Sequence, residues 1–320
     1  MTRGDAKSVR KDYGLPDHGC ASVTFEDNMP NDITLDAAVR SAVEEFLAVG
    51  IPSPQVDALL LAAHVLGIGR GELAARLVSG DTLTREQLDR LAGYVARRVA
   101  REPLQHITGE SGFRQLVLDI GPGAFVPRPE TELLVQMVVD AVLASGQASP
   151  RVIDLGTGSG AIALAVASEV PHANVWAVEK SPEARAWAAH NNEKYGGIVT
   201  LLAGDLATTE LLLGDEVGTM DVVVSNPPYI PDDAQPRDPE VRLYDPAVAL
   251  FGGADGLDVI RQVASVAARI IAPGGLVAIE HGELQGPAVR KILADAGWRN
   301  AATHPDLTTR DRYTTAVWSA

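Results

Sequence analysis

Hydrophobic residues between positions 34 and 99 recur every three or four positions, which is the spacing of amphipathic helices. Thr34 and Thr84 are suited to cap helix N-termini, and Gly50 and Gly67 are suited to end helices. The predicted helices cover residues 34–50, 53–67 and 84–99. Together they predict a small helical bundle over residues 32–110.

The pattern then changes to strand-like alternation, with apolar side chains at Phe113, Leu116, Leu118 and Ile120. Gly121-Pro122-Gly123 has the composition of a turn. We therefore expect a β-hairpin over residues 111–126 that links two domains. Residues 1–31, by contrast, mix charges, glycine, proline and asparagine without periodicity, which predicts a disordered tail.

Strand-like apolar runs alternate with helical segments from Arg151 onward. The predicted strands cover residues 152–155, 175–178, 199–202, 220–225, 276–280 and 314–318, and the predicted helices cover residues 160–168, 182–195, 257–271 and 286–296. This alternation is typical of an α/β fold with a doubly wound, mostly parallel sheet. We expect one such domain over residues 127–320.

Composition excludes several classes of protein. The chain has 320 residues, 46% of them hydrophobic, which is enough for two globular domains. Its single cysteine, Cys20, excludes an internal disulfide framework and a cysteine-built metal site. No apolar stretch reaches the ~18 residues of a membrane-spanning helix and no signal sequence is visible, so we expect a cytoplasmic protein. The net charge of -15 argues against binding nucleic acid mainly through its phosphates.

Asn226-Pro227-Pro228-Tyr229 follows the apolar run 220–225, which predicts a buried strand. Ligands of open α/β sheets sit at the carboxyl ends of strands, so we expect Asn226 to face a pocket while the prolines stiffen its turn. The Asn226 side-chain oxygen and a nearby main-chain carbonyl can accept both hydrogens of an amide or exocyclic amine, and Tyr229 can stack on that flat group. The motif indicates chemistry on a planar nitrogen, although four residues alone also fit a rigid surface turn.

A glycine-rich loop, Gly156-Thr157-Gly158-Ser159-Gly160, follows the first predicted strand of this domain. Closely spaced glycines let a ligand approach backbone N–H groups at a helix N-terminus. The spacing differs from the Gly-x-Gly-x-x-Gly that binds a pyrophosphate, so it favours a single nucleoside such as S-adenosylmethionine over a dinucleotide. Glu179 and Asp205 follow the next two strands, where Glu179 can accept from ribose hydroxyls and Asp205 from an adenine amine, or both can be helix N-caps.

The glycine loop and Asn226-Pro227-Pro228-Tyr229 together resemble a class I S-adenosylmethionine-dependent methyltransferase that acts on a planar nitrogen. Further motifs resemble the PrmC/HemK family, which methylates N5 of the glutamine in the Gly-Gly-Gln motif of bacterial peptide chain release factors. These motifs are Pro127-Arg128-Pro129-Glu130-Thr131-Glu132, Tyr244-Asp245-Pro246, Ala249-Leu250-Phe251-Gly252-Gly253, Asp255-Gly256-Leu257, Asp57-Ala58-Leu59-Leu60-Leu61-Ala62, Arg97-Arg98 and Glu102-Pro103-Leu104-Gln105. The resemblance spans residues 33–318 and so both predicted domains.

The resemblance implies a Rossmann-like, seven-stranded sheet, a helical N-terminal domain that docks the substrate, and the linking hairpin. It also implies a substrate site made of Asn226, Pro227, Pro228 and Tyr229, in which Asn226 and the Pro227 carbonyl bind the glutamine amide and Tyr229 packs near the transferring methyl group. The implied contacts with S-adenosylmethionine are Asp154, Gly156, Thr157, Gly158, Gly160, Glu179, Lys180, Asp205, Leu206 and Asn226. S-adenosylhomocysteine is the implied product and class I release factors are the implied partners. We expect a monomer, without a metal, membrane contact or direct nucleic-acid binding.

Some residues near the motifs keep more than one interpretation. Arg128 can close over the cofactor or substrate, but the charges around it also fit a solvated helix start with Thr131 as N-cap or first-turn residue. The role of Glu130 is open in the same way. His281 stands where the family often has an aliphatic residue, and we expect it to be packed or solvated at a strand end. Residues 306–310 lack a glycine that is frequent there in the family, which leaves the conformation of that loop open.

Three other functions share parts of this pattern. Nucleic-acid adenine methyltransferases use the same four-residue motif on an exocyclic amine, but base flipping favours a basic groove, and this chain is acidic. A non-catalytic cofactor-binding module needs no amide-binding motif, and a nicotinamide oxidoreductase is disfavoured by the glycine spacing. We therefore predict a protein glutamine methyltransferase, with N6-adenine or another exocyclic amine of DNA or RNA as the alternative substrate.

Overall fold

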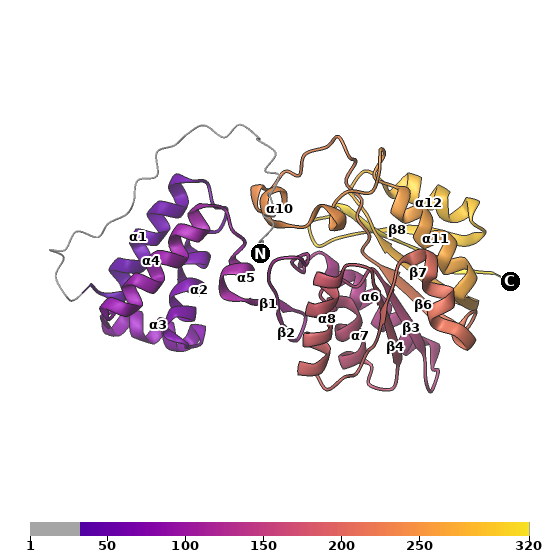
Figure 1. Cartoon of the computed structure of the whole chain (residues 1–320), viewed down its shortest axis with the longest axis horizontal. Helices are drawn as coiled ribbons and strands as arrows, with labels where there is room; N and C mark the ends of the chain where they lie inside the picture. Colours follow the sequence, from indigo (N-terminus) through magenta and orange to yellow (C-terminus); the bar gives the residue numbers. More distant parts are fainter. Residues whose placement is uncertain (1–32, 320) are drawn as a thin grey trace, which may run out of the picture.

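The computed structural model describes residues 33–319, so the expected tail over residues 1–31 lies outside the described residues. Figure 1 shows a helical part, a short hairpin and a larger part built around a sheet, in that order along the chain. The three parts match the order that the sequence pattern predicts.

The helical part contains α1 (Leu35–Ala48), α2 (Pro54–Leu66), α3 (Arg70–Ser79), α4 (Arg85–Val99) and α5 (Leu104–Thr108). Thr34 and Thr84 cap α1 and α4 with their side chains, as their positions predict. The apolar faces meet in a separate core around Phe46 and Leu61. Helices α3 and α5 are absent from the prediction, since α3 buries only Leu73 and α5 is very short. Within residues 33–319 no single helix is long and apolar enough to span a membrane, although the bent pair of α2 and α3 reaches that length and composition together.

The predicted hairpin is confirmed by β1 (Glu110–Phe113) and β2 (Leu116–Asp119), which pair antiparallel. Its turn is Arg114-Gln115, with Phe113 paired to Leu116. Arg114 has a left-handed backbone (φ 52°), and a search for glycine and proline misses such a turn. Gly121-Pro122-Gly123 follows the second strand instead. A Cβ on Gly121 would lie 2.6 Å from the ring of Trp187 in α8 (Pro182–Lys194), so glycine is required there for packing.

The larger sheet comprises β3 (Arg151–Leu155), β4 (Asn174–Glu179), β5 (Thr200–Ala203), β6 (Met220–Ser225), β7 (Ile271–Glu280), β8 (Trp298–Pro305) and β9 (Asp311–Trp318). Their order is β5-β4-β3-β6-β7-β9-β8. Strands β3 to β7 pair parallel, and β9 runs antiparallel to both of its neighbours. This confirms the predicted seven-stranded, mostly parallel sheet. Strand β8 is absent from the prediction because Trp298 is its one buried residue.

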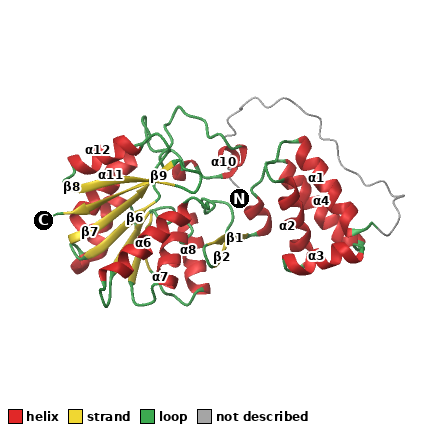
Figure 2. Ribbon diagram, turned by 180° about the vertical axis from the view of Figure 1, so that it is seen from behind, coloured by secondary structure: helices red, strands yellow, loops and turns green. Residues whose placement is uncertain are grey.

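Helices cover both faces of this sheet, as Figure 2 shows. The remaining helices are α6 (Thr131–Ser145), α7 (Ala161–Glu169), α9 (Thr209–Leu213), α10 (Pro239–Tyr244), α11 (Asp258–Ile270) and α12 (Gly286–Asp295), with 3-10 turns at Leu206–Thr208, Gly214–Glu216 and Ala247–Ala249. Helices α6 and α7 contribute to one hydrophobic core, and α11 and α12 contribute to a second core on the opposite face. The chain runs outward from β3 to β5 and then returns to β6, which lies beside β3. Ligands of doubly wound sheets bind where the winding reverses in this way.

Helix α10 connects the helical part to the sheet part (Figure 1). Arg98 and Arg101 each donate to one carboxylate oxygen of Glu240 in α10, both at 2.8 Å. Arg98 also donates to Asp57 in α2 at 2.8 Å and is itself buried. Burial alone would raise the pKa of Glu240, but the two guanidinium groups hold that pKa below its usual range. The helical part is thus anchored to the segment that follows Asn226-Pro227-Pro228-Tyr229.

Candidate active site

A cavity of about 1040 Å³ opens at the carboxyl ends of the parallel strands. The last residues of β3, β4, β6 and β7 all line it, namely Leu155, Glu179, Ser225 and Glu280. The hairpin and the link to α6 complete the wall with Phe113, Phe125 and residues 127–131. A space of this size suits a nucleoside cofactor and part of a second ligand.

The glycine loop turns sharply from β3 into α7. Gly156, Gly158 and Gly160 have φ values of 77°, 60° and 88°, in the left-handed region that favours glycine. The N–H groups of Gly156 and Thr157 donate to the Val178 carbonyl at 2.9 and 3.0 Å, which ties the loop to β4. A Cβ on Gly156 or Gly158 would meet nothing within 4 Å, and both residues line the cavity. The loop therefore leaves room for a ligand against its backbone.

Glu179 holds the backbone on two sides of the cavity wall. Its Oε2 accepts a hydrogen bond from the Gly158 N–H at 2.8 Å, and its Oε1 accepts one from the Ser181 N–H at 2.7 Å. An ionised carboxylate has about four acceptor positions, so two remain for the hydroxyls of a ligand. Glu179 is 8% exposed and lines the cavity, which fits the predicted cofactor contact.

Lys180 and Asp205 form an ion pair at the cavity wall, with Nζ 2.7 Å from Oδ2. The other oxygen of Asp205 accepts a hydrogen bond from the Ala207 N–H at 3.0 Å and so caps the turn that contains Leu206. Hydrogen bonds from Lys180 and then Ala207 lower the pKa of Asp205. Asp205 is therefore a cap that also faces the cavity, and a ligand amine that reaches it competes with Lys180.

Two predicted cofactor residues do not line the cavity. Asp154 is fully buried beneath the loop, where its Oδ2 accepts a hydrogen bond from the Thr157 hydroxyl at 2.6 Å. Burial raises the pKa of Asp154 to about 7. Gly160 packs beside α8, since a Cβ on Gly160 would lie 3.5 Å from the Cα of Ala188. Both residues therefore lie outside the cavity wall, and their predicted contacts with the cofactor stay predictions.

Asn226 directly follows β6 and lines the cavity, and its side chain is hydrogen-bonded to a residue of α6. Its Nδ2 donates to the Thr131 hydroxyl at 3.2 Å. The same hydroxyl donates to Oε2 of Glu280 at 2.7 Å. Glu280 is 3% exposed, and burial raises its pKa to about 7. With Nδ2 engaged, the Oδ1 of Asn226 is left as the acceptor for a ligand.

The turn after Asn226 is held by the segment between α10 and α12. The Ile230 N–H donates to the Leu250 carbonyl at 2.9 Å, and the Gln285 side chain donates to the Tyr229 carbonyl at 3.0 Å. A Cβ on Gly252 would lie 2.5 Å from the Pro228 oxygen, and one on Gly256 would lie 2.3 Å from the Tyr229 oxygen. The glycines of these motifs thus allow the close approach of two backbones. Their contribution is to fix the conformation of the turn.

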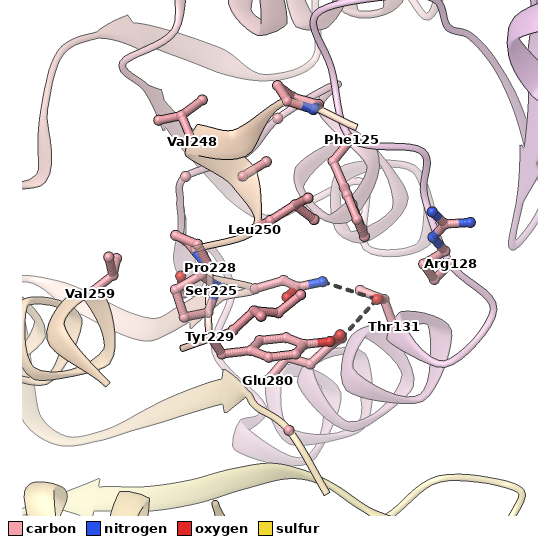
Figure 3. Close-up of a pocket in the computed structure, with 18 of the residues that line it drawn as sticks. Phe125, Arg128, Thr131, Ser225, Pro228, Tyr229, Val248, Leu250, Val259 and Glu280 are labelled. Carbon is pink, nitrogen blue, oxygen red and sulfur yellow. Dashed lines mark hydrogen bonds between the residues drawn. The ribbon is translucent and has the colours of Figure 1, made fainter. Parts of the chain in front are cut away.

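Tyr229 extends along the cavity beside Glu280, as Figure 3 shows. Burial, followed by the nearby Glu280 charge, raises the pKa of Tyr229 well above its usual range. The phenol therefore stays neutral, which suits a ring that packs against a flat ligand.

Arg128 is committed to a partner at the cavity wall. Its guanidinium lies 5.0 Å from the centre of the Phe125 ring and donates to Oδ2 of Asp245 at 2.8 Å. The Asp245 side chain is fully buried, and burial raises its pKa. Glu130 lines the same wall but is exposed. Arg128 therefore joins two motifs of the resemblance by an ion pair at the edge of the cavity.

Two open questions of the sequence pattern have structural answers. His281 is fully buried, its Nε2 is 2.8 Å from the Thr314 hydroxyl, and it does not line the cavity, which confirms a packed histidine. In the loop over residues 306–310, Thr309 adopts φ 66°, the conformation that glycine favours. Asp306 closes this loop by accepting from the N–H groups of Thr308 and Arg310. Within the described residues no cluster of His, Cys, Asp or Glu could hold a metal ion.

Sequence reasoning identified the four residues of the Asn-Pro-Pro-Tyr turn but missed the hydrogen-bonded groups, Thr131 and Glu280, that lie beside the Asn226 side chain. The sequence pattern predicts Thr131 only as a cap or first-turn residue, and Thr131 is the first residue of α6. The sequence pattern assigns no role to Glu280, although Glu280 directly precedes His281. The available signal was a carboxylate at the end of an otherwise apolar strand, which is costly to bury without a function.

Comparison with known proteins covers both parts of the chain. Residues 37–109 match the PrmC N-terminal domain family, and residues 129–247 match the Methyltransferase small domain family. The chain is 48% identical to the release factor glutamine methyltransferase of Streptomyces coelicolor, over 88% of this chain and 96% of that protein. It is 43% identical to the enzyme of the same name from Mycolicibacterium smegmatis, over 88% and 97% of the two chains. It is 40% identical to that of Deinococcus radiodurans, over 87% and 96%.

Proposed function

Since the chain belongs to the release factor glutamine methyltransferase family, we propose that it transfers a methyl group from S-adenosylmethionine to the side-chain nitrogen of a glutamine in a peptide chain release factor. The target that the sequence resemblance implies is N5 of the glutamine in the Gly-Gly-Gln motif of class I release factors. The observation that carries the proposal is that the glycine loop and Asn226-Pro227-Pro228-Tyr229 line one cavity. A cofactor site and an amide site are therefore adjacent.

The cavity fits S-adenosylmethionine in three respects. Gly156 and Gly158 leave open space where a side chain would stand, so a ligand can lie against their backbone. Glu179 retains acceptor positions for ribose hydroxyls, and Asp205 and Leu206 lie at the end of the next strand. When bound, S-adenosylmethionine would supply an electrophilic methyl group on sulfur for transfer to the glutamine nitrogen, with S-adenosylhomocysteine as the product.

The residues of the Asn-Pro-Pro-Tyr turn would hold the acceptor. An amide nitrogen is a poor nucleophile because its lone pair is delocalised into the carbonyl, so orientation and charge stabilisation must lower the barrier. The Asn226 Oδ1 and the Pro227 carbonyl can each accept one N–H of the glutamine, which fixes the nitrogen and stabilises the positive charge it gains. Orientation can account for ~7–11 kcal/mol of the barrier. The neutral ring of Tyr229 would pack beside the amide plane.

No strong base is needed beside the acceptor nitrogen in this scheme. The N–H becomes acidic as the new C–N bond forms, and water can remove the proton afterwards. His281, the nearest histidine in sequence to the site, is buried and bonded to Thr314, so it cannot take that role. Glu280 is 3% exposed and accepts a hydrogen bond from the Thr131 hydroxyl, which suits an orienting group better than a base.

The helical part would dock the release factor. It is anchored by Arg98 and Arg101 to Glu240 in α10, and the same segment carries Asp245, the partner of Arg128 at the cavity wall. A protein bound to the helical part would therefore approach the cavity past α10. The acidic net charge of -15 supports a protein substrate over a nucleic acid.

The test is transfer of radiolabelled methyl from S-adenosylmethionine to a purified class I release factor. A Gln→Ala variant of its Gly-Gly-Gln motif and total nucleic acid are assayed in parallel. Label on the wild-type factor alone is the expected result. Label on nucleic acid alone would overturn the proposed substrate and move it to an exocyclic amine of a base.

A further inference from the structure

The Thr131 hydroxyl sits between two polar side chains that come from different strands. It receives the Asn226 Nδ2–H at 3.2 Å and donates to Glu280 Oε2 at 2.7 Å, as the two dashed lines in Figure 3 show. Thr131 is 4% exposed and Glu280 is 3% exposed, so water contributes little to either group. The hydroxyl has one proton, and a buried carboxylate without a donor is costly.

These hydrogen bonds determine which end of the Asn226 amide faces the cavity. An ionised Glu280 accepts only, so the Thr131 proton goes to Glu280 and the Thr131 oxygen is left to accept. Asn226 satisfies that oxygen with Nδ2. A rotated amide would bring Oδ1 toward the Thr131 oxygen and the Glu280 carboxylate, where no proton is available, and would present Nδ2 to the cavity. A donor in that position cannot accept an N–H of the substrate.

We propose that Thr131 and Glu280 are positioning residues that hold the Asn226 side chain with its oxygen toward the acceptor nitrogen. The inference rests on the proposed function, because it assigns Asn226 the task of accepting an N–H of a planar nitrogen. It adds a function for the Thr131 of the Pro127–Glu132 motif and for the carboxylate at the end of β7. Both residues would act on the reaction through Asn226.

The orientation depends on the charge of Glu280. Burial raises the pKa of Glu280 to about 7, whereas the hydrogen bond from Thr131 and the charge of Arg312 on β9 oppose that rise. The charge of Glu130 before α6 adds to the rise. The neutral phenol of Tyr229 lies on the same side. A protonated Glu280 can donate to the Thr131 oxygen, and the Thr131 proton is then free to turn toward Asn226. Low pH would thus favour the rotated Asn226 amide, which presents Nδ2 to the cavity.

The kinetic test uses Thr131→Val, which keeps the shape and removes the hydroxyl, with Thr131→Ser as the conservative variant. Misplacement of an orienting group lowers the rate steeply, so we expect kcat to fall about tenfold or more in Thr131→Val. Tm should fall in Thr131→Val because Glu280 loses its hydrogen-bond donor, whereas KM for the release factor and Kd for S-adenosylmethionine should stay close to wild type. Thr131→Ser should restore both kcat and Tm. Thr209→Val is the matched control, because Thr209 is also a buried first residue of a helix and its hydroxyl has no partner within the described residues.

The charge of Glu280 gives a second kinetic readout. The wild-type kcat should fall as pH decreases below about 7, the pKa of Glu280. Glu280→Gln cannot titrate, so its profile should lack this acid limb whatever its absolute rate. A merely structural role of Glu280 would lower Tm without removing a limb from the pH profile.

A direct readout separates this inference from the proposed substrate. The side-chain amide resonances of Asn226, assigned in asparagine-labelled protein by comparison with Asn226→Ala, report the Nδ2 hydrogen bond without any substrate. They should shift in Thr131→Val, stay unchanged in Thr209→Val, and titrate with a midpoint near the Glu280 pKa. If the release factor receives no radiolabelled methyl group but the Asn226 resonances shift as described, the proposed substrate is refuted and the orienting role is not. The inference would be overturned if the Asn226 amide resonances changed neither in Thr131→Val nor with pH. It would also be overturned if Thr131→Val had the wild-type kcat.

Discussion

Removal of the Asn226 side chain should separate methyl transfer from cofactor binding. Asn226→Ala deletes the Oδ1 acceptor at the end of β6, while the glycine loop and Glu179 belong to β3 and β4 and keep their own hydrogen bonds. Loss of one preorganised hydrogen-bonding group at a reacting centre typically lowers kcat by about 10²–10³, or ~3–4 kcal/mol. We expect a fall of that size with Kd for S-adenosylmethionine unchanged.

The stability cost of the same substitution should be small. The structure shows one hydrogen bond from the Asn226 side chain, the 3.2 Å contact with Thr131, and such a bond contributes about 1 kcal/mol. For a chain of this size that loss lowers Tm by roughly 2–4 °C. Asn192→Ala is the matched control, since Asn192 bonds to the Val199 backbone through both ends of its amide and does not line the cavity. It should lower Tm at least as much and leave kcat unchanged.

The assay combines single-turnover methyl transfer to the release factor, calorimetric titration with S-adenosylmethionine, and thermal unfolding of the three proteins. Parallel losses of cofactor affinity and transfer in Asn226→Ala would refute the assignment of Asn226 to the acceptor. So would a transfer rate within a few-fold of wild type. A defect in Asn192→Ala equal to that in Asn226→Ala would mean that the assay reports stability and not chemistry.

Three further perturbations have defined outcomes. Glu179→Ala removes a charged acceptor that also holds the Gly158 N–H, and hydrogen bonds to charged groups contribute about 1.5–3 kcal/mol, so Kd for S-adenosylmethionine should rise at least about tenfold by calorimetry; an unchanged Kd would contradict its role in binding. Thr309→Gly relieves a left-handed backbone on a β-branched residue and should raise stability by about 0.5–1 kcal/mol, measured by denaturant unfolding, whereas a loss of stability would show that the loop is not strained. The folded-state pKa of Glu280 is about 7 against an ordinary value of 4.5, so the native state holds the extra proton between these values and the free energy of unfolding should fall as pH rises from about 4.5 to 7. Glu280→Gln should remove the Glu280 part of that dependence, on the order of 3 kcal/mol, and leave the part that comes from Asp154, whose pKa burial also raises to about 7. An unchanged pH dependence in Glu280→Gln would show that Glu280 does not titrate in this range.

The helical domain shows how far local pattern reaches. Capped helices with a strong apolar stripe, such as α1 and α4, follow from spacing alone because their own residues supply the cap and the buried face. Helix α3 is stabilised by contacts that its sequence does not display, since Leu73 is its one buried residue. The hairpin is similar: alternation predicts the strands, but the Arg114-Gln115 turn has no glycine or proline to mark it.

The site shows the same contrast between features that local sequence pattern predicts and features that depend on tertiary contacts. Asn226-Pro227-Pro228-Tyr229 and the glycine loop are contiguous, and each follows a strand whose apolar run is visible, so their place at the carboxyl edge of the sheet is predictable from the sequence. The position of Asp154 is not visible in the sequence, because the burial of a residue two positions before the loop depends on the tertiary packing around it.

The sequence by itself therefore determined the fold class, the family, and the places of the glycine loop and of Asn226-Pro227-Pro228-Tyr229 at the ends of their strands. Only the tertiary structure placed Thr131 against Asn226, 95 positions away, and against Glu280, 149 positions away. It also paired Arg128 with Asp245 and placed Thr309 in a conformation that its residue type disfavours. Motifs follow from short-range spacing. The orientation of an amide depends on which side chains the packing of α6 against β6 and β7 brings within hydrogen-bonding distance, and no local pattern encodes that distance.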